Sequence, residues 1–559
     1  MSNNIGGLRV QRIEAKAFKA FRNLDFKLDG RHLLAYGDNG AGKSSLYWLL
    51  YTFLQSAAKD TSSATKYFDP NRSEHLLNVH SDAVEKSQAH ISVTLDTADH
   101  ANSHRYTLSA IKHGTKQIPD ILKANLASDF VTYRTLFNFY RFRNSEAIDL
   151  WPVFECEILP FCYTTTERDL DGLWRQLRDN NPFTRGIPGP AKKRYDEFDA
   201  KATRLNTALT QALQSISKEA LEFYQQHFSG DDVLNVQFGL ILRTPMSMYD
   251  RGQHRFDEPS IGFEVQLGGE KLERPHTFLN EAKLTQLALS VRFGATLVHL
   301  QDAPTKLLVL DDLLISLDMS NRMKVVDIIL SETFAAHQKI ILTHDMGFFN
   351  EFRRRIGPAH TDWSFQRFTG SAEAEIRLSE DKTPLQKAED YLQGYNLEEA
   401  AVCLRKAAED TARRYREWAE KKQLPPGRFF SLTGNLRTAR NKLKGDIPDQ
   451  LYEKVLKGTP KKHRELLLSS DNTDLDGNES LSSADKGILK AQRKRLRQVV
   501  TDDAWAKMEA IEVVDRVLAM TDRVLNPAAH GSAAPLYQEE VRKALTLINR
   551  LENILKESL

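Results

Sequence analysis

The fold of this chain is decided by nine residues, Gly37-Asp38-Asn39-Gly40-Ala41-Gly42-Lys43-Ser44-Ser45. They fit the pattern G-x-x-x-x-G-K-[ST], which is the phosphate-binding loop of nucleotide hydrolases. An apolar run at residues 32–36 predicts a buried strand before the loop, and residues 46–50 predict a helix after it. Because a chance glycine turn would not be framed in this way, the sequence predicts a nucleotide site here.

Each residue type in the loop has a chemical role. Glycines let backbone N–H groups curve around an anion, and the N-terminus of the following helix adds partial positive charge. Lys43 is expected to reach the β- and γ-phosphates of ATP, and the Ser44 hydroxyl is expected to bind Mg²⁺. The residues expected to contact the nucleotide are Gly37, Asn39, Gly40, Ala41, Gly42, Lys43, Ser44 and Ser45.

A second apolar run, residues 307–310, ends in two acids, Asp311 and Asp312. It predicts a buried parallel strand that presents carboxylates at its C-terminal end, where open α/β sheets bind ligands. We expect Asp311 to hold Mg²⁺, directly or through water. Asp312 stands where many such ATPases have a glutamate that orients the attacking water. Its shorter side chain favours slow or partner-dependent hydrolysis.

Two more segments follow in the same order along the chain. Residues 316–318 read Ser-Leu-Asp, and an apolar strand predicted at 340–343 ends in His344. A histidine at that strand end could contact the γ-phosphate or the attacking water, although a lone histidine there would more often be structural. The order of loop, acids, Ser-Leu-Asp and histidine makes Asp312 and His344 the candidate catalytic residues.

In this order the motifs resemble those of ATP-binding-cassette-type heads in chromosome-maintenance, recombination and phage-defence ATPases. The resemblance implies an α/β P-loop head whose signature segment opens a helix and contacts the γ-phosphate held by a second head. Residues 278–285, Phe-Leu-Asn-Glu-Ala-Lys-Leu-Thr, occupy that position and depart from the Leu-Ser-Gly-Gly of the family. Asn280 can replace the serine as helix N-cap and side-chain donor, so it joins the expected nucleotide contacts. The alternative is an ordinary capped helix.

The fold class that follows is an α/β ABC-type (P-loop) ATPase head, split by a short helical arm, plus an all-helical C-terminal domain. We expect residues 1–120 to form the N-terminal half of the head, 121–232 the helical arm insertion, 233–378 the C-terminal half and 379–559 the helical domain. Helical spacing of the apolar residues from Leu205 to Leu221 marks the arm. It is far too short for the long coiled coil of recombination ATPases.

The tail offers two weaker constellations. Asp474, Asp476 and Glu479 could suggest a metal site, but they lie in a hydrophilic loop and not at the ends of buried strands, which favours a solvated loop. Arg523 and His530 loosely resemble the Arg…His motif of helical, HEPN-like ribonucleases, which could stabilise a phosphorane and move a proton. The same segment also reads as a helix-breaking corner with a proline and a glycine.

Composition limits the classes of function. The chain has 559 residues, 41% of them hydrophobic, and a net charge of only +2, so nucleic-acid contact would have to come from a local basic patch. The basic run is too spread around its helix to form one face, and it reads as solvated or as a phosphate or acidic-partner contact; its members are Lys490, Arg493, Lys494, Arg495 and Arg497. Three cysteines without a Cys-x-x-Cys pair, and no apolar run near the roughly 20 residues that span a bilayer, favour a cytoplasmic protein without a membrane segment.

The whole layout resembles the ATPase subunit of Septu-type antiphage systems, the PtuA family, including the forms that serve as retron effectors. The resemblance implies ATP and Mg²⁺ as cofactors, head-to-head dimers and higher oligomers, and a PtuB-like HNH endonuclease as partner. A retron form would add a reverse transcriptase with its RNA–DNA product. Two alternatives stay open: a self-contained effector with a C-terminal ribonuclease of the anticodon-nuclease type, and a recombination-type DNA-repair ATPase.

Overall fold

The computed structural model describes residues 7–97, 103–132, 146–164, 167, 169–179, 192–231, 235–244, 247–250, 255–313, 319–371, 373, 375–421, 431–448, 451–457, 459–468, 481–526 and 535–557. The chain forms two compact units, Met1–Asp381 and Lys382–Leu559. Strand β15 (Arg377–Glu380) pairs with β14 (Trp363–Thr369) inside the first unit. The unit boundary therefore follows Asp381, and the predicted boundary after residue 378 would have cut through a strand.

The centre of the first unit, the head, is a six-stranded sheet in the order β15-β14-β3-β13-β12-β6. Every neighbouring pair is parallel except β14 and β15. The remaining strands are β3 (His32–Gly37), β6 (Asp129–Thr132), β12 (Leu307–Asp311) and β13 (Gln338–Thr343). Strands β12 and β13 are buried along their whole length, as parallel strands covered on both faces should be. The predicted strands at 32–36, 307–310 and 340–343 are confirmed.

The strand order brings the candidate site together. Strand β13 lies between β3 and β12, and its Leu342 is level with Ala35 on one side and Asp311 on the other. The C-terminal ends of the three strands therefore meet at one edge of the sheet, where open α/β sheets bind their ligands. The glycine loop follows β3, the two acids close β12, and His344 follows β13.

The predicted start of the arm at residue 121 conflicts with the strand pairing, while its predicted end at residue 232 stays a prediction. Strand β6, with the helix α4 (Pro119–Ala127) before it, lies within the predicted arm, yet β6 pairs with β12 and closes one edge of the core sheet. At the other end, strands β7 (Val236–Thr244), β10 (Ser260–Leu267) and β11 (Glu270–Leu272) form a separate sheet and do not join the core sheet. A strand of four residues carries too little periodicity to reveal a partner so far along the chain.

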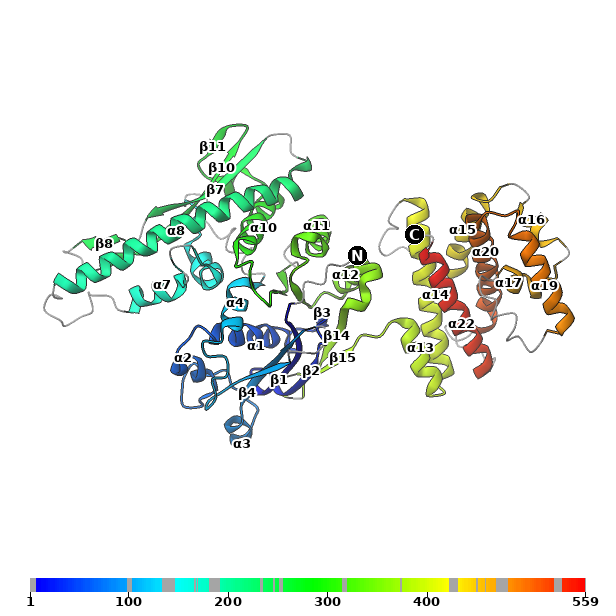
Figure 1. The fold of residues 1–559 in the computed structure, drawn as a ribbon, viewed down its shortest axis with the longest axis horizontal. Coiled ribbons are helices and arrows are strands. Elements are labelled where there is room, and N and C mark those ends of the chain that lie inside the picture. The colour runs from blue at the N-terminus through cyan, green and yellow to red at the C-terminus, as the bar shows by residue number, and fades with distance from the viewer. Residues whose placement is uncertain are drawn as a thin grey trace. The chain divides into compact units, whose positions relative to one another are not determined.

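The arm is built on one long helix, α8 (Lys192–His227), of 36 residues. Its spaced apolar residues from Leu205 to Ile216 are buried and Leu221 is partly buried, which confirms the helical spacing read from the sequence. Figure 1 shows α8 lying alongside β7, whose alternating Val236, Phe238 and Leu240 are buried in the same core. The helix also packs against α10 (Glu281–Val298), so the arm continues into the head without a break in its core.

The head also contains a four-stranded antiparallel sheet in the order β2-β1-β4-β5. Along the chain, β1 and β2 precede the glycine loop, and β4 and β5 follow it. Its strands are β1 (Arg9–Phe18), β2 (Phe21–Lys27), β4 (His90–Asp96) and β5 (His104–Ser109). The main helices near the site are α1 (Lys43–Ser56), α11 (Met319–Leu330) and α12 (Met346–Ile356). Smaller elements are α2 (Thr61–Thr65), η1 (Lys66–Phe68), α3 (Ala83–Ser87), α6 (Trp151–Val153), η2 (Phe154–Ile158), η3 (Leu159–Phe161), α7 (Leu170–Asp179), η4 (Ser229–Asp231), β8 (Ser247–Asp250), β9 (Arg255–Asp257), α9 (Pro275–Phe278), η6 (Glu332–Phe334) and η7 (Gly357–Asp362).

The second unit has its own hydrophobic core, formed between helices. They are α13 (Pro384–Gln393), α14 (Leu397–Glu420), α15 (Leu432–Gly445), α16 (Leu451–Leu456), α17 (Lys461–Leu468), α19 (Ser483–Leu496), α20 (Asp502–Met520), η8 (Thr521–Leu525) and α22 (Gln538–Glu557). Helix α13 begins with a capping box, in which Thr383 and Gln386 satisfy each other's backbone N–H groups. In the part of the chain that the structure describes, no helix is long and apolar enough to cross a membrane.

Candidate functional site

The glycine loop has the backbone conformation that its sequence requires. Gly40 has φ 86° and Gly42 has φ 99°, a left-handed region that side chains other than glycine rarely adopt. At Gly42 there is also no room, because a Cβ would lie 2.8 Å from Ile376 Cδ1. Helix α1 starts at Lys43 with Gly42 as its N-cap and without a side-chain cap. Its first N–H groups are thus left to bind an anion.

Lys43 is a buried cation at the start of α1. Its Nζ donates to Gly37 O at 2.7 Å and to Asp38 O at 3.1 Å, so the ammonium lies inside the loop and does not extend into solvent. The next two residues, Ser44 and Ser45, face in different directions. Ser44 is exposed, whereas Ser45 is buried and its Oγ accepts from Ala20 N at 3.2 Å. That bond fixes the turn between β1 and β2 to the loop.

Asp311, the last residue of β12, faces the loop. It is buried, and its Oδ1 has no hydrogen-bond partner in the described part of the chain. Burial is the largest influence on its pKa and raises it, as does the charge of Asp312. A hydrogen bond from Ser44 and the charges of Lys43 and His344 lower it, and the resulting pKa is about 6. A buried carboxylate oxygen without a partner, next to the Ser44 hydroxyl, is the donor chemistry that Mg²⁺ takes.

No three histidine, cysteine or acidic side chains of the described ranges group as a metal site. The fit to Mg²⁺ therefore rests on Asp311 and Ser44 alone, with the remaining positions left for phosphate oxygens and water, as Mg²⁺ commonly has in phosphate sites. When bound, the ion would neutralise phosphate charge.

Asp312 and His344 lie together across the ends of β12 and β13. The Asp312 Oδ1 accepts from the backbone N of His344 at 2.9 Å, and its Oδ2 lies 3.0 Å from His344 Nδ1. The Asp312 backbone N donates to Leu342 O at 3.0 Å and its φ is 53°. Aspartate tolerates this left-handed conformation better than most residues do. The backbone here therefore suits aspartate at this position.

Asn280 is the N-cap of α10, and its side chain accepts from Lys283 N at 2.8 Å. The prediction that it caps this helix is confirmed, and its contact with a nucleotide stays a prediction. The carboxamide leaves its NH₂ group as a donor at the helix start. Residues 316–318, the Ser-Leu-Asp segment, lie outside the described residues.

Sequence reasoning missed a buried ion pair that joins α10 to the core sheet. Arg292 Nη1 donates to Asp129 Oδ2 at 2.6 Å, Nη2 binds Oδ1 of the same carboxylate, and Thr296 donates to it as well. Both partners are almost completely buried. Burial works against both charges, yet the charge and hydrogen bonds of Arg292 hold the pKa of Asp129 below its usual value. The signature-like helix and β6 are thereby tied together.

Two further contacts surround the strand ends. Arg322 Nη1 donates to Asp345 Oδ2 at 2.8 Å, and Asp345 caps α12 by accepting from Phe348 N. Lys19 Nζ lies 5.3 Å from the ring centre of Trp48, which is 39% exposed. The sequence could have placed Trp48 near the loop, because a residue four positions after Ser44 lies on the same face of a helix.

The basic residues of the tail are partly structural. Arg493 is buried, its Nε donates to Leu467 O at 3.2 Å, and its guanidinium also binds Leu466 O, so it caps the end of α17. Arg497 lies over the Trp505 ring at 5.2 Å. For Arg493 the solvated interpretation is wrong, whereas Lys490, Lys494, Arg495 and Arg497 are exposed.

Arg523 is engaged in a structural contact. Its Nη2 donates to Pro535 O at 3.2 Å and lies 2.9 Å from Glu540 Oε2, which fastens η8 to the start of α22. His530 lies outside the described residues, as do Asp474, Asp476 and Glu479. These contacts of Arg523 are structural ones, as expected if this segment is a corner between two helices.

No protein-family profile and no curated protein matches this chain. Similar solved structures include RecF bound to ATP, with 11% identity and a TM-score of 0.41 over 68% of this chain and 100% of that one. An SMC head bound to the C-terminal winged-helix domain of ScpA has 14% identity and a TM-score of 0.34, covering 67% and 98%. The Pyrococcus furiosus Smc head, bound to the C-terminal domain of ScpA, has 13% and 0.35, covering 70% and 100%. What this chain binds has to be inferred from its own site.

Proposed function

We propose that this chain binds MgATP where the glycine loop, Asp311 and the Asp312–His344 pair converge, and that it is the ATP-binding subunit of a bacterial antiphage complex. The observation that carries the nucleotide site is the buried Asp311 Oδ1, which has no hydrogen-bond partner among the described residues and lies beside Ser44 at the start of a helix without a side-chain cap. A phosphate on α1 and a cation at Asp311 would satisfy both groups at once.

Hydrolysis in this proposal is slow and depends on Asp312. Its carboxylate accepts the His344 backbone N–H through Oδ1, and its Oδ2 lies 3.0 Å from the imidazole Nδ1, so it positions His344. The carboxylate is directed at His344, which leaves Asp312 poorly placed to activate water quickly by itself. His344, one third exposed, presents the rest of its ring outward.

Asp312→Asn should lower the ATP hydrolysis rate by about 100-fold, the lower end of a general acid–base contribution, because His344 loses the carboxylate beside its ring, while ATP affinity changes little. The carboxamide oxygen can still accept from His344 N, and asparagine also tolerates the φ of 53°. Single-turnover hydrolysis and equilibrium ATP binding would be measured side by side. Asp302→Asn, on an exposed side chain, is the matched control. Unchanged hydrolysis in Asp312→Asn would remove Asp312 from the mechanism.

Head-to-head dimers held by ATP are the second element of the proposal. Asn280→Ala removes the cap bond to Lys283 N and the side-chain donor, so it should destabilise α10 by about 1 kcal/mol and abolish the ATP-dependent dimer. Asn280→Ser keeps a capping oxygen and should retain the dimer. The measurement is light scattering after size exclusion with ATP, in the slowly hydrolysing Asp312→Asn background. A dimer that forms equally in all three would show that Asn280 does not contact the shared nucleotide.

The finer proposal is a Septu-type, PtuA-like subunit that binds and restrains an HNH nuclease. It is supported by the split head, the short arm, the aspartate in the catalytic position and the helical second unit. Bound ATP would hold the heads together and the nuclease inactive, and nucleotide loss would shift that population. A reverse transcriptase with its RNA–DNA product would make the complex a retron.

Purification of the tagged chain from its native locus, with identification of co-eluting proteins, tests this directly. A stoichiometric HNH protein supports the Septu-type proposal. A lone homodimer with ribonuclease activity that His530→Ala abolishes would favour the self-contained effector, and hydrolysis stimulated by DNA would favour a repair ATPase.

A further inference from the structure

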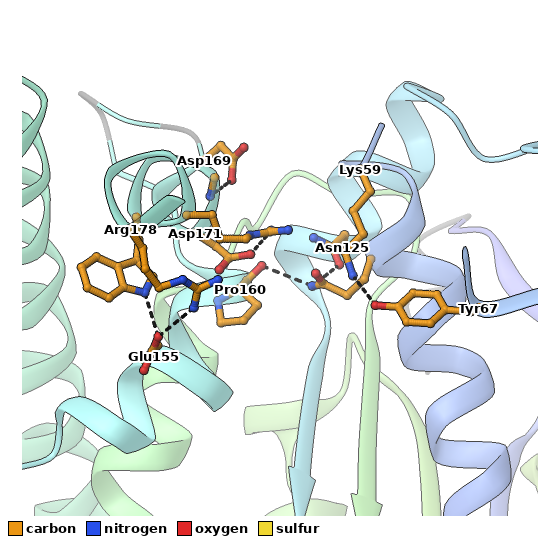
Figure 2. Close-up of polar contacts among 12 residues, drawn as sticks. Lys59, Tyr67, Asn125, Glu155, Pro160, Asp169, Asp171 and Arg178 are labelled. Atoms are coloured by element: carbon orange, nitrogen blue, oxygen red, sulfur yellow. Dashed lines mark hydrogen bonds and ion pairs between the residues drawn. The ribbon is translucent and has the colours of Figure 1, made fainter. Parts of the chain in front are cut away.

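A cavity of about 330 Å³ lies away from the glycine loop, between α1 and the arm. Tyr51, Gln55 and Lys59 line it from the α1 side, and residues of η2, η3 and α7 line it from the arm. Figure 2 shows Asp171 and Pro160 between Lys59 on one side and Glu155 with Arg178 on the other. Its volume falls within the range of small-molecule pockets.

The acids in the lining already have cation partners. Glu155 Oε1 accepts from Trp174 Nε1 at 2.9 Å and from Arg178 Nη1 at 3.3 Å. Asp171 accepts from Arg175 one helical turn later. These pairs neutralise the negative charge of the lining, so the acids do not make the cavity a site for a cation.

Three hydrogen-bond donors in the lining are not used by these ion pairs. The Nε of Arg175 is buried and has no hydrogen bond within the described ranges. Lys59 Nζ contacts the hydroxyl of Tyr67 at 3.4 Å, and no carboxylate of the described residues pairs with it. The Tyr51 hydroxyl is the third donor, on a side chain that also lines the cavity.

The pKa shifts of Tyr51 and Asp171 show that these groups lie close enough to influence one another. Burial raises the pKa of Tyr51, with Asp171, Tyr67 and Arg175 among the charges that act on it, so its hydroxyl is a donor at neutral pH. Burial also raises the pKa of Asp171, whereas Arg175 and, more weakly, Lys59 lower it.

We propose that this cavity binds a small phosphate monoester. An ammonium from the turn after α1, a guanidinium on α7 and a phenol on α1 line the cavity, and the three terminal oxygens of a phosphate ester supply acceptors for all three. The cavity is far larger than one inorganic phosphate, which leaves space for the organic group beside Pro160 and the Tyr51 ring. The site is separate from the loop, since Ser44 and Gln55 are roughly 16 Å apart along α1.

The test uses the full chain carrying Lys43→Ala, so that phosphates do not bind at the glycine loop. Ribose 5-phosphate, AMP and inorganic phosphate are titrated by calorimetry. The exposed thiol of Cys156, which lines the cavity, is alkylated with and without each compound, and Cys403 in the other unit serves as the internal reference. We expect at least one ester to bind and to slow alkylation of Cys156 alone, with affinity about 10-fold lower in Lys59→Gln and in Arg175→Lys, which removes Nε–H but keeps the charge.

Lys66→Gln is the matched control, because Lys66 also lies over the Tyr67 ring, pairs with Glu74 and does not line the cavity. Three outcomes would overturn the proposal: no ester binds, inorganic phosphate binds as well as the esters, or the affinity is the same in Lys59→Gln and Arg175→Lys as in Lys66→Gln. Because the loop is disabled throughout, the result is independent of whether the chain is an ATPase.

Discussion

Lys43→Ala should lower ATP affinity by about 100-fold, as expected when charge-assisted contacts to phosphates are removed. The Lys43 ammonium is buried inside the loop and held by Gly37 O and Asp38 O, so it is already positioned for phosphates with little reorganisation. Equilibrium binding of a fluorescent ATP analogue with Mg²⁺ measures the loss. Trp48, exposed on the same helix, offers a second readout, because its emission should change in the wild-type chain only.

The control for this experiment separates binding from folding. Lys43→Met keeps the buried stem of the side chain and should lose affinity equally, whereas Lys66→Ala, on a partly exposed cation paired with Glu74, should bind ATP normally. Thermal unfolding is recorded for each variant. If Lys43→Met is fully folded and binds ATP as tightly as the wild type, the glycine loop is not the nucleotide site.

Arg292→Met should destabilise the head by about 3–5 kcal/mol, because it leaves the Asp129 carboxylate buried without its charge partner. The carboxylate would retain only neutral donors, the hydroxyl of Thr296 and the backbone N–H of Phe130. Hydrogen exchange, followed by mass spectrometry on peptides of β6 and α10, measures the effect where it arises. Both elements should exchange much faster in the variant, and peptides of the second unit should be unaffected.

Two comparisons make this result specific. Arg12→Met breaks a pair with Asp25 at 2.6 Å on two half-exposed side chains, and it should leave exchange in β6 and α10 unchanged. The double variant Asp129→Leu with Arg292→Met removes both charges and should recover most of the lost protection. A single Arg292→Met variant as protected as wild type would mean that the ion pair does not hold α10 on the sheet.

The strand, loop and helix around Lys43, and the apolar strands that end in Asp311 and Thr343, could be predicted because each motif is local and its burial is continuous. Strand β6 could not, since four residues beginning with a charged aspartate do not look like the edge of a buried sheet. Its position depends on pairing with β12, far along the chain.

The residues of the candidate site could be predicted from the sequence, but their contacts with one another could not. Sequence order suggested Asp312 and His344, but their contact depends on the left-handed φ of Asp312 and on β13 lying beside β12. Arg493 shows the opposite failure, because charge alone suggested solvent. Its spacing from Leu489 and Leu496, at four and three residues, puts it on the buried face of α19 and was the signal that could have corrected the interpretation.

The pairing of Asp129 with Arg292 also constrains how this protein can diverge. A lineage that changes one of the two must pass through a chain with an unpaired buried charge, which folds poorly and is removed by selection. The two positions should therefore covary: homologues will carry both charges or replace both with apolar residues. Where an alignment shows the acid without the arginine, a cation from another element should stand in its place.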